Sequence, residues 1–212
     1  MRFAAPCLLA RVVLAPLFVA LQAVPALAQS ASGGPQTTRG SFLVGLNGGV
    51  GWADATSDDP QDTLETELGG TGHVRAGWRV TRHVVLGGDL SFWTRKRNLL
   101  GDDVWFTMYN ASAVVSVYPA PSGTGFFVTA GGGVAYADAD VKRRSSRVTV
   151  ELGSGPGLIV GAGYEHGRGR LAFSPAVTWW HGWIGDRRSR GGAVASNWRQ
   201  SVVDVSVGVT FR

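Results

Sequence analysis

The sequence predicts an all-β protein: an eight-stranded, antiparallel, up-and-down transmembrane β-barrel that follows a cleaved N-terminal signal peptide. Three observations predict this fold class. The first residues have the anatomy of an export signal, polar and apolar residues alternate through eight later segments, and aromatic residues gather at both ends of those segments. The composition agrees, because 31 glycines among 212 residues disfavour a helical domain.

The N-terminal segment 1–28 has the parts of a signal peptide. Arg2 and Arg11 provide positive charge, residues 12–21 are apolar, and small residues lead up to Ala28. An uncleaved membrane anchor is the alternative, but prolines interrupt the apolar stretch and no stop-transfer pattern follows it. We therefore expect cleavage after Ala28 and export of the remaining chain.

The mature chain is predicted to form one domain. Residues 29–40 are rich in Ser, Thr and Gly and predict a flexible lead-in, whereas residues 41–212 suit a single barrel. The one cysteine, Cys7, lies in the signal peptide, so the mature chain has no disulfide and no cysteine-based metal site or nucleophile. Without Arg2 and Arg11, 18 basic and 15 acidic side chains remain, a balance too mild to indicate nucleic-acid binding.

Eight segments alternate with a period of two, as strands with one apolar face do. They are 42–52, 73–80, 84–95, 104–118, 126–136, 147–165, 171–179 and 203–211. The predicted outward faces include Val44, Val74, Leu86, Val115, Val128, Val160, Val177 and Val207. The sixth segment is expected to keep Leu152 and Leu158 in one phase with Val160 over its whole length. No later segment approaches 18 uninterrupted apolar residues, so any membrane crossing must use strands, whose backbone groups find partners in lipid only in a closed barrel.

Segment length and end chemistry favour a membrane barrel over a soluble one. Segments 42–52 and 126–136 would each rise roughly 25 Å when tilted, the height of an outer-membrane apolar band. Aromatic side chains then form two girdles at head-group level. One girdle is expected to contain Phe42, Trp78, Tyr118, Phe126, Tyr164 and Phe211, although Tyr118 is off the outward phase of its segment. The other is expected to contain Trp52, Phe92, Trp93, Trp105, Tyr136, Trp179 and Trp180.

The connections between segments alternate in length. Short turns are expected at 81–83, 119–124 and 166–169, and long external loops at 54–66, 96–103, 138–147 and 182–197. This alternation places both chain ends on the periplasmic side. Pro156 and Pro175 fall inside segments, where each removes a ladder hydrogen bond, so we expect bulges or irregular pairing there.

The last segment carries the most specific family likeness. Its alternating apolar residues end in an aromatic residue, at Val203, Val205, Val207, Val209 and Phe211. The mature chain resembles the small OmpA/OmpX-like family of eight-stranded outer-membrane β-barrels. The resemblance implies that these five positions form an assembly signal for the barrel-assembly machinery, although Arg212 follows the aromatic residue here. It also implies a bacterial outer-membrane location. The sequence leaves the oligomeric state open, with a monomer favoured.

Several charged side chains are predicted to point into the barrel. This lumen polar network consists of Arg75, Arg79, Asp89, Arg95, Glu165, Arg170 and Asp204. The turn at 81–83 would place Arg75 opposite Asp89, and the turn at 166–169 would place Glu165 opposite Arg170. A static network that neutralises charges in a narrow lumen is the favoured interpretation, and a gated ion path is the alternative.

The external loops carry a second candidate site, made of basic side chains. These are Lys142, Arg143, Arg144, Arg187, Arg188 and Arg190. Cations just outside an aromatic girdle could bind lipopolysaccharide phosphates or an anionic host or phage surface. The alternative is that they only keep the loops solvated.

We expect a structural or surface-interaction protein that lacks an open pore, with outer-membrane lipid and lipopolysaccharide as its surroundings. No catalytic residue, metal site or cofactor is predicted, because the four histidines are scattered. A lipid A-modifying enzyme is one alternative. It would use His181 and Asp186, but Trp183 occupies the position where a lipid A deacylase-like pattern has serine. A soluble periplasmic barrel that binds a small apolar ligand is the other.

Overall fold

The computed structural model describes residues 42–58, 64–99, 102–120, 125–143, 146–167, 170–189 and 192–212. Its strands are β1 (Phe42–Thr56), β2 (Leu64–Arg79), β3 (Val84–Leu99), β4 (Asp102–Val117), β5 (Gly125–Arg143), β6 (Ser146–Glu165), β7 (Leu171–Phe173), β8 (Ala176–Ser189) and β9 (Gly192–Phe211). The predicted signal peptide 1–28 and lead-in 29–40 lie outside the described residues.

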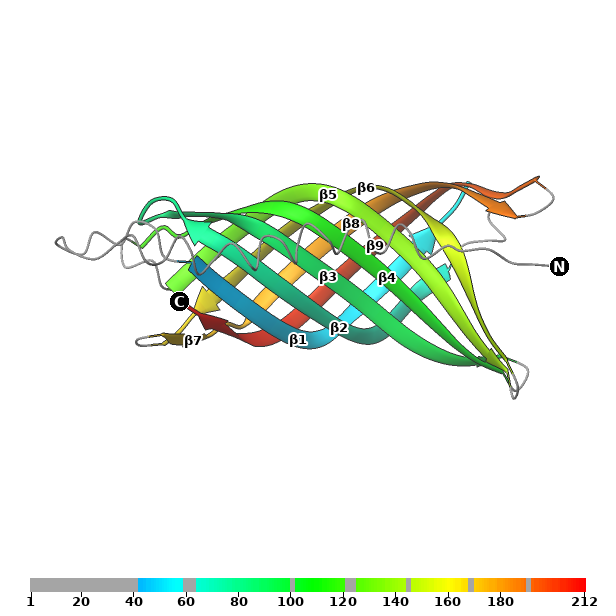
Figure 1. Ribbon diagram of the computed structural model, residues 1–212, viewed down its shortest axis with the longest axis horizontal. Helices are drawn as coiled ribbons and strands as arrows, with labels where there is room; N and C mark the ends of the chain where they lie inside the picture. The colour runs from blue at the N-terminus through cyan, green and yellow to red at the C-terminus, as the bar shows by residue number, and fades with distance from the viewer. Residues whose placement is uncertain are drawn as a thin grey trace. The chain divides into compact units, whose positions relative to one another are not determined.

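The sheet closes on itself (Figure 1). Neighbouring strands are antiparallel, and β1 pairs with β9. β7 and β8 form one wall strand, because both pair with β9, and Ser174 between them exchanges two backbone hydrogen bonds with Gly208. The predicted closed, eight-stranded antiparallel barrel is therefore confirmed. We call the end where β1 begins and β9 ends the inner end, and the opposite end the outer end.

The outward face of the wall is apolar, as the alternation predicts. The exposed fractions of Leu86, Val160 and Val207 are 47%, 42% and 52%. A soluble barrel that held an apolar ligand would bury such side chains, so that alternative is wrong. Two-residue alternation of β-branched and small residues produces this arrangement because successive side chains of a strand point to opposite faces.

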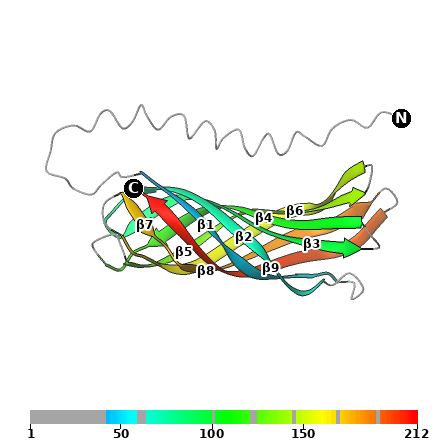
Figure 2. The same ribbon diagram turned by 90° about the horizontal axis from the view of Figure 1, so that it is seen from below.

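The strands continue well beyond the predicted segments at the outer end. β5 reaches Arg143 and β8 reaches Ser189, so most of the predicted loops 96–103, 138–147 and 182–197 is strand. The prediction of long loops there is wrong. Outside the bilayer both faces of a hairpin contact water, so its strands do not show the alternation from which strands are predicted. Figure 2 shows these hairpins spreading apart at the outer end.

The two prolines behave differently. Pro175 separates β7 from β8, and its carbonyl accepts the Tyr164 N–H at 3.0 Å. Pro156 lies within an uninterrupted β6, opposite Val134 of β5, while the ladder between β6 and β8 runs only from Gly157 to Gly163 on the β6 side. The predicted irregular pairing is thus present as a strand break at Pro175 and as the end of a ladder beside Pro156.

A register shift in β6 reverses which face its residues occupy. The pairing with β5 shifts between Ala137 and Asp138, Gly153 opposite them has a φ of 143°, and Leu152 is buried. A positive φ is easy for glycine and lets the extra residue be absorbed as a bulge. The prediction that Leu152 shares the outward phase of Val160 is wrong.

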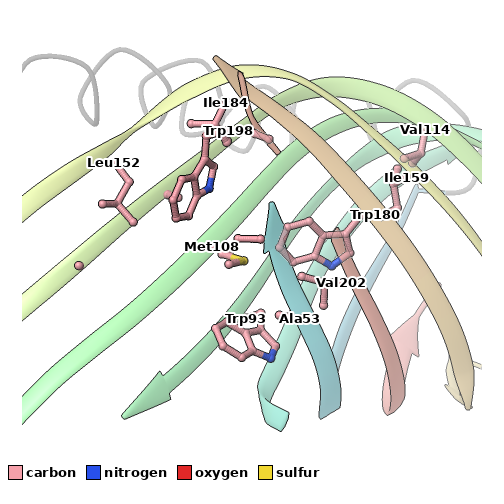
Figure 3. Close-up of a cluster of buried hydrophobic side chains, with 14 residues drawn as sticks. Ala53, Trp93, Met108, Val114, Leu152, Ile159, Trp180, Ile184, Trp198 and Val202 are labelled. Carbon is pink, nitrogen blue, oxygen red and sulfur yellow. The ribbon is translucent and has the colours of Figure 1, made fainter. Parts of the chain in front are cut away.

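Buried apolar side chains pack inside the barrel in two clusters. A large apolar cluster occupies the outer half (Figure 3), with members Ala53, Ala55, Trp93, Met108, Val114, Ala135, Ala137, Ala139, Leu152, Ile159, Trp180, Ile184, Trp198 and Val202. A smaller cluster at the inner end contains Leu43, Val85, Tyr118, Phe127 and Ala176. Trp93, Trp180 and Tyr118 therefore lie inside the barrel, and their predicted places in the outward girdles are wrong.

Candidate functional site

Between the two apolar clusters lies a polar network centred on Arg75 and Asp89. The two residues are opposite each other in the β2–β3 ladder. The Arg75 guanidinium donates to Asp89 Oδ2 from Nε at 2.9 Å and lies 2.8 Å from the same oxygen through Nη2. Its Nη1 donates to Thr129 Oγ1 across the bore at 3.3 Å. The predicted cross-strand pairing of Arg75 with Asp89 is confirmed.

His73 links the two buried aspartates of this network. Its Nε2 is 3.1 Å from Asp204 Oδ1, and its Nδ1 is 3.0 Å from Ser91 Oγ and 3.5 Å from Asp89 Oδ1. Ser91 Oγ in turn donates to Asp89 Oδ1 at 2.6 Å. Two buried carboxylates next to one guanidinium are balanced in charge when His73 is protonated. His73 is absent from the predicted network, although its position two residues before Arg75 gives it the same inward phase.

The remaining residues of the predicted lumen network lie at different levels of the barrel. Arg79 is buried near the inner end, with its guanidinium 5.1 Å from the centre of the Tyr118 ring. Glu165 accepts a hydrogen bond from the Tyr118 hydroxyl at 2.9 Å and forms an ion pair with Arg212. Arg95 lies at the outer end, where it pairs with Glu67 at 3.2 Å. It is therefore not part of the central network.

Glu165 does not meet Arg170, so that predicted pair is wrong. The isolated bridge from His166 to Phe173 sets a wider turn than predicted, and Arg170 is exposed. Arg212 takes the place of Arg170 beside Glu165, and its backbone N–H donates to the Arg170 carbonyl at 3.0 Å. Arg212, which follows the terminal aromatic residue, therefore forms an ion pair with the buried carboxylate of Glu165.

The space that remains near the network is small. A cavity of about 20 Å³ borders His73, Arg75, Tyr118 and Glu165 at the inner side, which is room for about one water molecule. In the part of the barrel that the structure describes, packed apolar side chains stand on both sides of this polar layer along the bore. The arrangement suits a static charge network.

Paired charges stabilise the described parts of the outer end. Arg95 and Arg97 both pair with Glu67, and Lys96 pairs with Asp103 at 2.7 Å. The Lys96 ammonium donates to the Asp103 carboxylate and lowers the pKa of that group below its ordinary value. These contacts connect β2 to β3 and β3 to β4 above the apolar band.

The predicted basic site falls largely where side chains are not described. Lys142 is exposed on β5. Arg143 belongs to β5 and Arg187 and Arg188 belong to β8, so all three are strand residues rather than loop residues as predicted. Arg144 and Arg190 lie outside the described residues. The described members therefore lie near the ends of β5 and β8.

His181 is surrounded by rings on the outward face of β8. Its ring is 4.6 Å from that of Trp183 and 6.0 Å from that of Trp179, centre to centre. Ser201 lies opposite it on β9, but the Ser201 Oγ accepts a hydrogen bond from Trp179 Nε1 at 2.9 Å. Among the described side chains no hydrogen bond joins His181 to Ser201, as a nucleophile and its base require.

The apolar face of β9 contains the five positions of the proposed assembly signal. Val203, Val205, Val207, Val209 and Phe211 all point outward, with exposed fractions between 41% and 52%. The strand pairs on one side with β1 and on the other with β7 and β8, so it closes the barrel.

Over the described ranges, no group of three or more His, Cys, Asp and Glu side chains is arranged to hold a metal ion. In the same ranges, no helix has the length and apolarity needed to span a membrane.

Comparison with known proteins places this fold in a family. The structure of Neisserial surface protein A (NspA) is 18% identical with a TM-score of 0.53, covering 81% of this chain and 97% of that chain. The structure of Ail, the attachment invasion locus protein of Yersinia pestis, in complex with the heparin analogue sucrose octasulfate, is 9% identical with a TM-score of 0.55, covering 81% and 99%. No curated protein matches the sequence. At these identities the two structures show a shared fold. The model of the outer membrane protein beta-barrel domain matches residues 14–211, so this chain belongs to that family of bacterial outer-membrane proteins.

Proposed function

We propose that this protein is a sealed outer-membrane anchor whose outer hairpins bind anionic groups at the cell surface, in the first place the phosphates of lipopolysaccharide. The observation that carries the proposal is the division of the barrel. Two clusters of buried apolar side chains pack in its bore, its outward band is apolar, and its strands continue past that band into charged hairpins. Such a barrel presents chemistry to its surroundings only through the outer ends of its strands.

The basic residues of the hairpins support anion binding. The β8–β9 hairpin carries Arg187, Arg188 and Arg190 in four positions, and the β5–β6 hairpin carries Lys142, Arg143 and Arg144 in succession. Guanidinium groups bind phosphate in a bidentate manner and are favoured at such sites. The Ail structure contains a sulfated sugar, so sulfated glycans are a second class of anion to test.

The experiment compares two charge-reversal variants in the full-length protein. In the first, Arg187, Arg188 and Arg190 are all changed to Glu, and in the control Arg82, exposed in the inner turn, is changed to Glu. We expect the triple variant to bind purified lipopolysaccharide about tenfold more weakly, and the control to bind as the wild type does. Unchanged lipopolysaccharide binding by the triple variant would remove this function.

The role is proposed to be non-enzymatic. The lipid A-modifying alternative needs a nucleophile that His181 can activate, and the neighbouring Ser201 is instead engaged by Trp179. Mass spectra of lipid A from cells that express the wild type or His181→Ala should be identical. A lipid A species present only with the wild type would establish enzymatic activity instead.

A further inference from the structure

The outward faces of β8, β9 and β1 change from apolar to polar along one row of paired residues. Trp179 is opposite Val203, and Val203 is opposite Trp52. In the next row toward the outer end, His181, Ser201 and Asp54 take the corresponding positions. The row beyond contains Trp183, Arg199 and Thr56. We call the six residues of these two outer rows the head-group patch.

The position of the patch indicates what it contacts. Trp52 and Trp179 are exposed at the edge of the apolar band, and tryptophan at such an edge lies at the level of lipid head groups. Side chains one and two rows farther out on the outward wall therefore face head groups rather than acyl chains. The level of the patch on the wall therefore suits a lipid head group.

The patch contains one basic and one acidic side chain, Arg199 and Asp54, which do not form an ion pair with each other in the described part of the barrel. Arg199 and Asp54 are diagonal neighbours on β9 and β1, a relation that places their backbones about 7–8 Å apart. Both lie close enough to His181 to act on it electrostatically. Among the ion pairs of the described residues, none joins Arg199 to Asp54, and Arg199 is exposed. The patch thus offers one cation and one anion side by side.

Aromatic rings hold this arrangement in place. Trp183 meets the His181 ring edge to face, and Trp179 fixes the Ser201 hydroxyl through its indole N–H. The exposed ring of Trp183 is directly opposite Arg199 across the ladder. Such a ring can also attract an ammonium group through its face.

We propose that the head-group patch binds a zwitterionic lipid head group, a phosphate joined to a primary amine as in phosphoethanolamine. Arg199 binds the phosphate, and Asp54 binds the ammonium group next to the Trp183 ring. A purely anionic head group would meet repulsion from Asp54, and a purely cationic one would meet repulsion from Arg199. The proposal does not depend on the hairpin arginines, since none of them belongs to the patch.

The test measures lipid retained by the full-length protein in detergent, by native mass spectrometry, after exposure to phosphatidylethanolamine or phosphatidylglycerol. These two probes share the phosphate and differ in the amine. We expect the wild type to retain phosphatidylethanolamine in preference. Arg199→Gln and Asp54→Asn should each lower that retention about threefold, the size of an exposed charge pair.

Arg82→Gln removes an exposed cation from the inner turn and should leave the preference unchanged. Heat-dependent migration on gels shows whether each variant is folded. Equal retention of the two lipids by the wild type, or a preference that survives both patch substitutions in folded protein, would overturn the proposal. Because the hairpin variant described above leaves Arg199 and Asp54 intact, failure of lipopolysaccharide binding and failure of the patch are distinguishable.

Discussion

Asp89 and Asp204, the two most deeply buried carboxylates among the described side chains, have unequal partners. Asp89 interacts with Arg75, Ser91 and His73, whereas the only described partner of Asp204 is His73, and its Oδ2 accepts no hydrogen bond from the protein. A buried charge that loses its sole counter-ion is strongly destabilising. At the scale of single residues, His73 is therefore the side chain on which Asp204 depends.

We predict that His73→Ala lowers the free energy of unfolding by about 3–5 kcal/mol, because Asp204 is then buried without a cation. Asp204→Asn should cost less, since His73 keeps Asp89 as a partner. Urea titrations of the protein folded into lipid vesicles give both values. The double variant should lose less free energy of unfolding than the two single variants lose in sum. A loss equal to that sum would show that the two residues are not coupled.

At the scale of strands, close approach of neighbouring strands depends on inward-facing glycines. A Cβ atom on Gly133 of β5 would lie 1.9 Å from the carbonyl oxygen of Ala111 on β4. A Cβ atom on the adjacent Gly132 would meet its nearest neighbour, the Gly157 carbonyl oxygen, at an ordinary 3.5 Å. The two glycines therefore have different roles although they are consecutive.

We predict that Gly133→Ala destabilises the barrel by about 1–3 kcal/mol, because β4 and β5 must move apart. Gly132→Ala is its matched control and should change stability by about 0.5 kcal/mol or less. Both are measured by the urea concentration at which the heat-resistant folded band disappears from gels. Equal effects of the two substitutions would show that the spacing of β4 and β5 is not limited by Gly133.

The outward face of β9 supports a prediction about assembly. If Phe211 belongs to an assembly signal, Phe211→Ala should slow the appearance of folded protein in vesicles that contain the barrel-assembly machinery. Leu171→Ala is the control, because Leu171 is opposite Phe211 on β7 and is similarly exposed, at 50% against 52%. Equal slowing by both substitutions would point to lost apolar surface rather than to a signal.

At the scale of the whole molecule, passage of ions depends on how tightly side chains pack inside the bore. The outer apolar cluster contains three buried tryptophans, and the cavity at the network has room for about one water molecule. We predict that the wild-type protein in a planar bilayer shows no steady single-channel conductance. Discrete openings of the wild type would instead support the gated ion path.

The sequence predicts the architecture well because lipid imposes one simple rule on every strand, apolar side chains outward. It also predicts the pairing of Arg75 with Asp89, since a short turn fixes their register. The pairs Phe92–Trp93 and Trp179–Trp180 show a limit of that rule. Consecutive strand residues point to opposite faces, so one ring of each pair had to lie inside the barrel.

Other features depend on distances that no local pattern contains. His73 on β2 meets Asp204 on β9 across the intervening β1, so their contact depends on the stagger of three strands. The length of the outer hairpins could not be predicted either. Outside the bilayer apolar and polar residues no longer need to alternate, while the backbone hydrogen bonds between strands continue. The Glu165 partner was missed because the turn after β6 is wider than its glycines suggest.

The short ladder between β6 and β8 has a mechanical consequence. Among the described residues, its ladder runs from Gly157 to Gly163 on β6 and from Ala176 to Gly182 on β8, which is shorter than the β2–β3 ladder from Gly70 to Arg79. Toward the inner end, the Tyr164–Pro175 hydrogen bond and the His166–Phe173 bridge continue this seam past the break at Pro175. Neighbouring strands separate most easily where the fewest backbone hydrogen bonds join them. Amide protons next to this seam should therefore exchange with deuterium before those of β4 and β5, marking where the wall unzips.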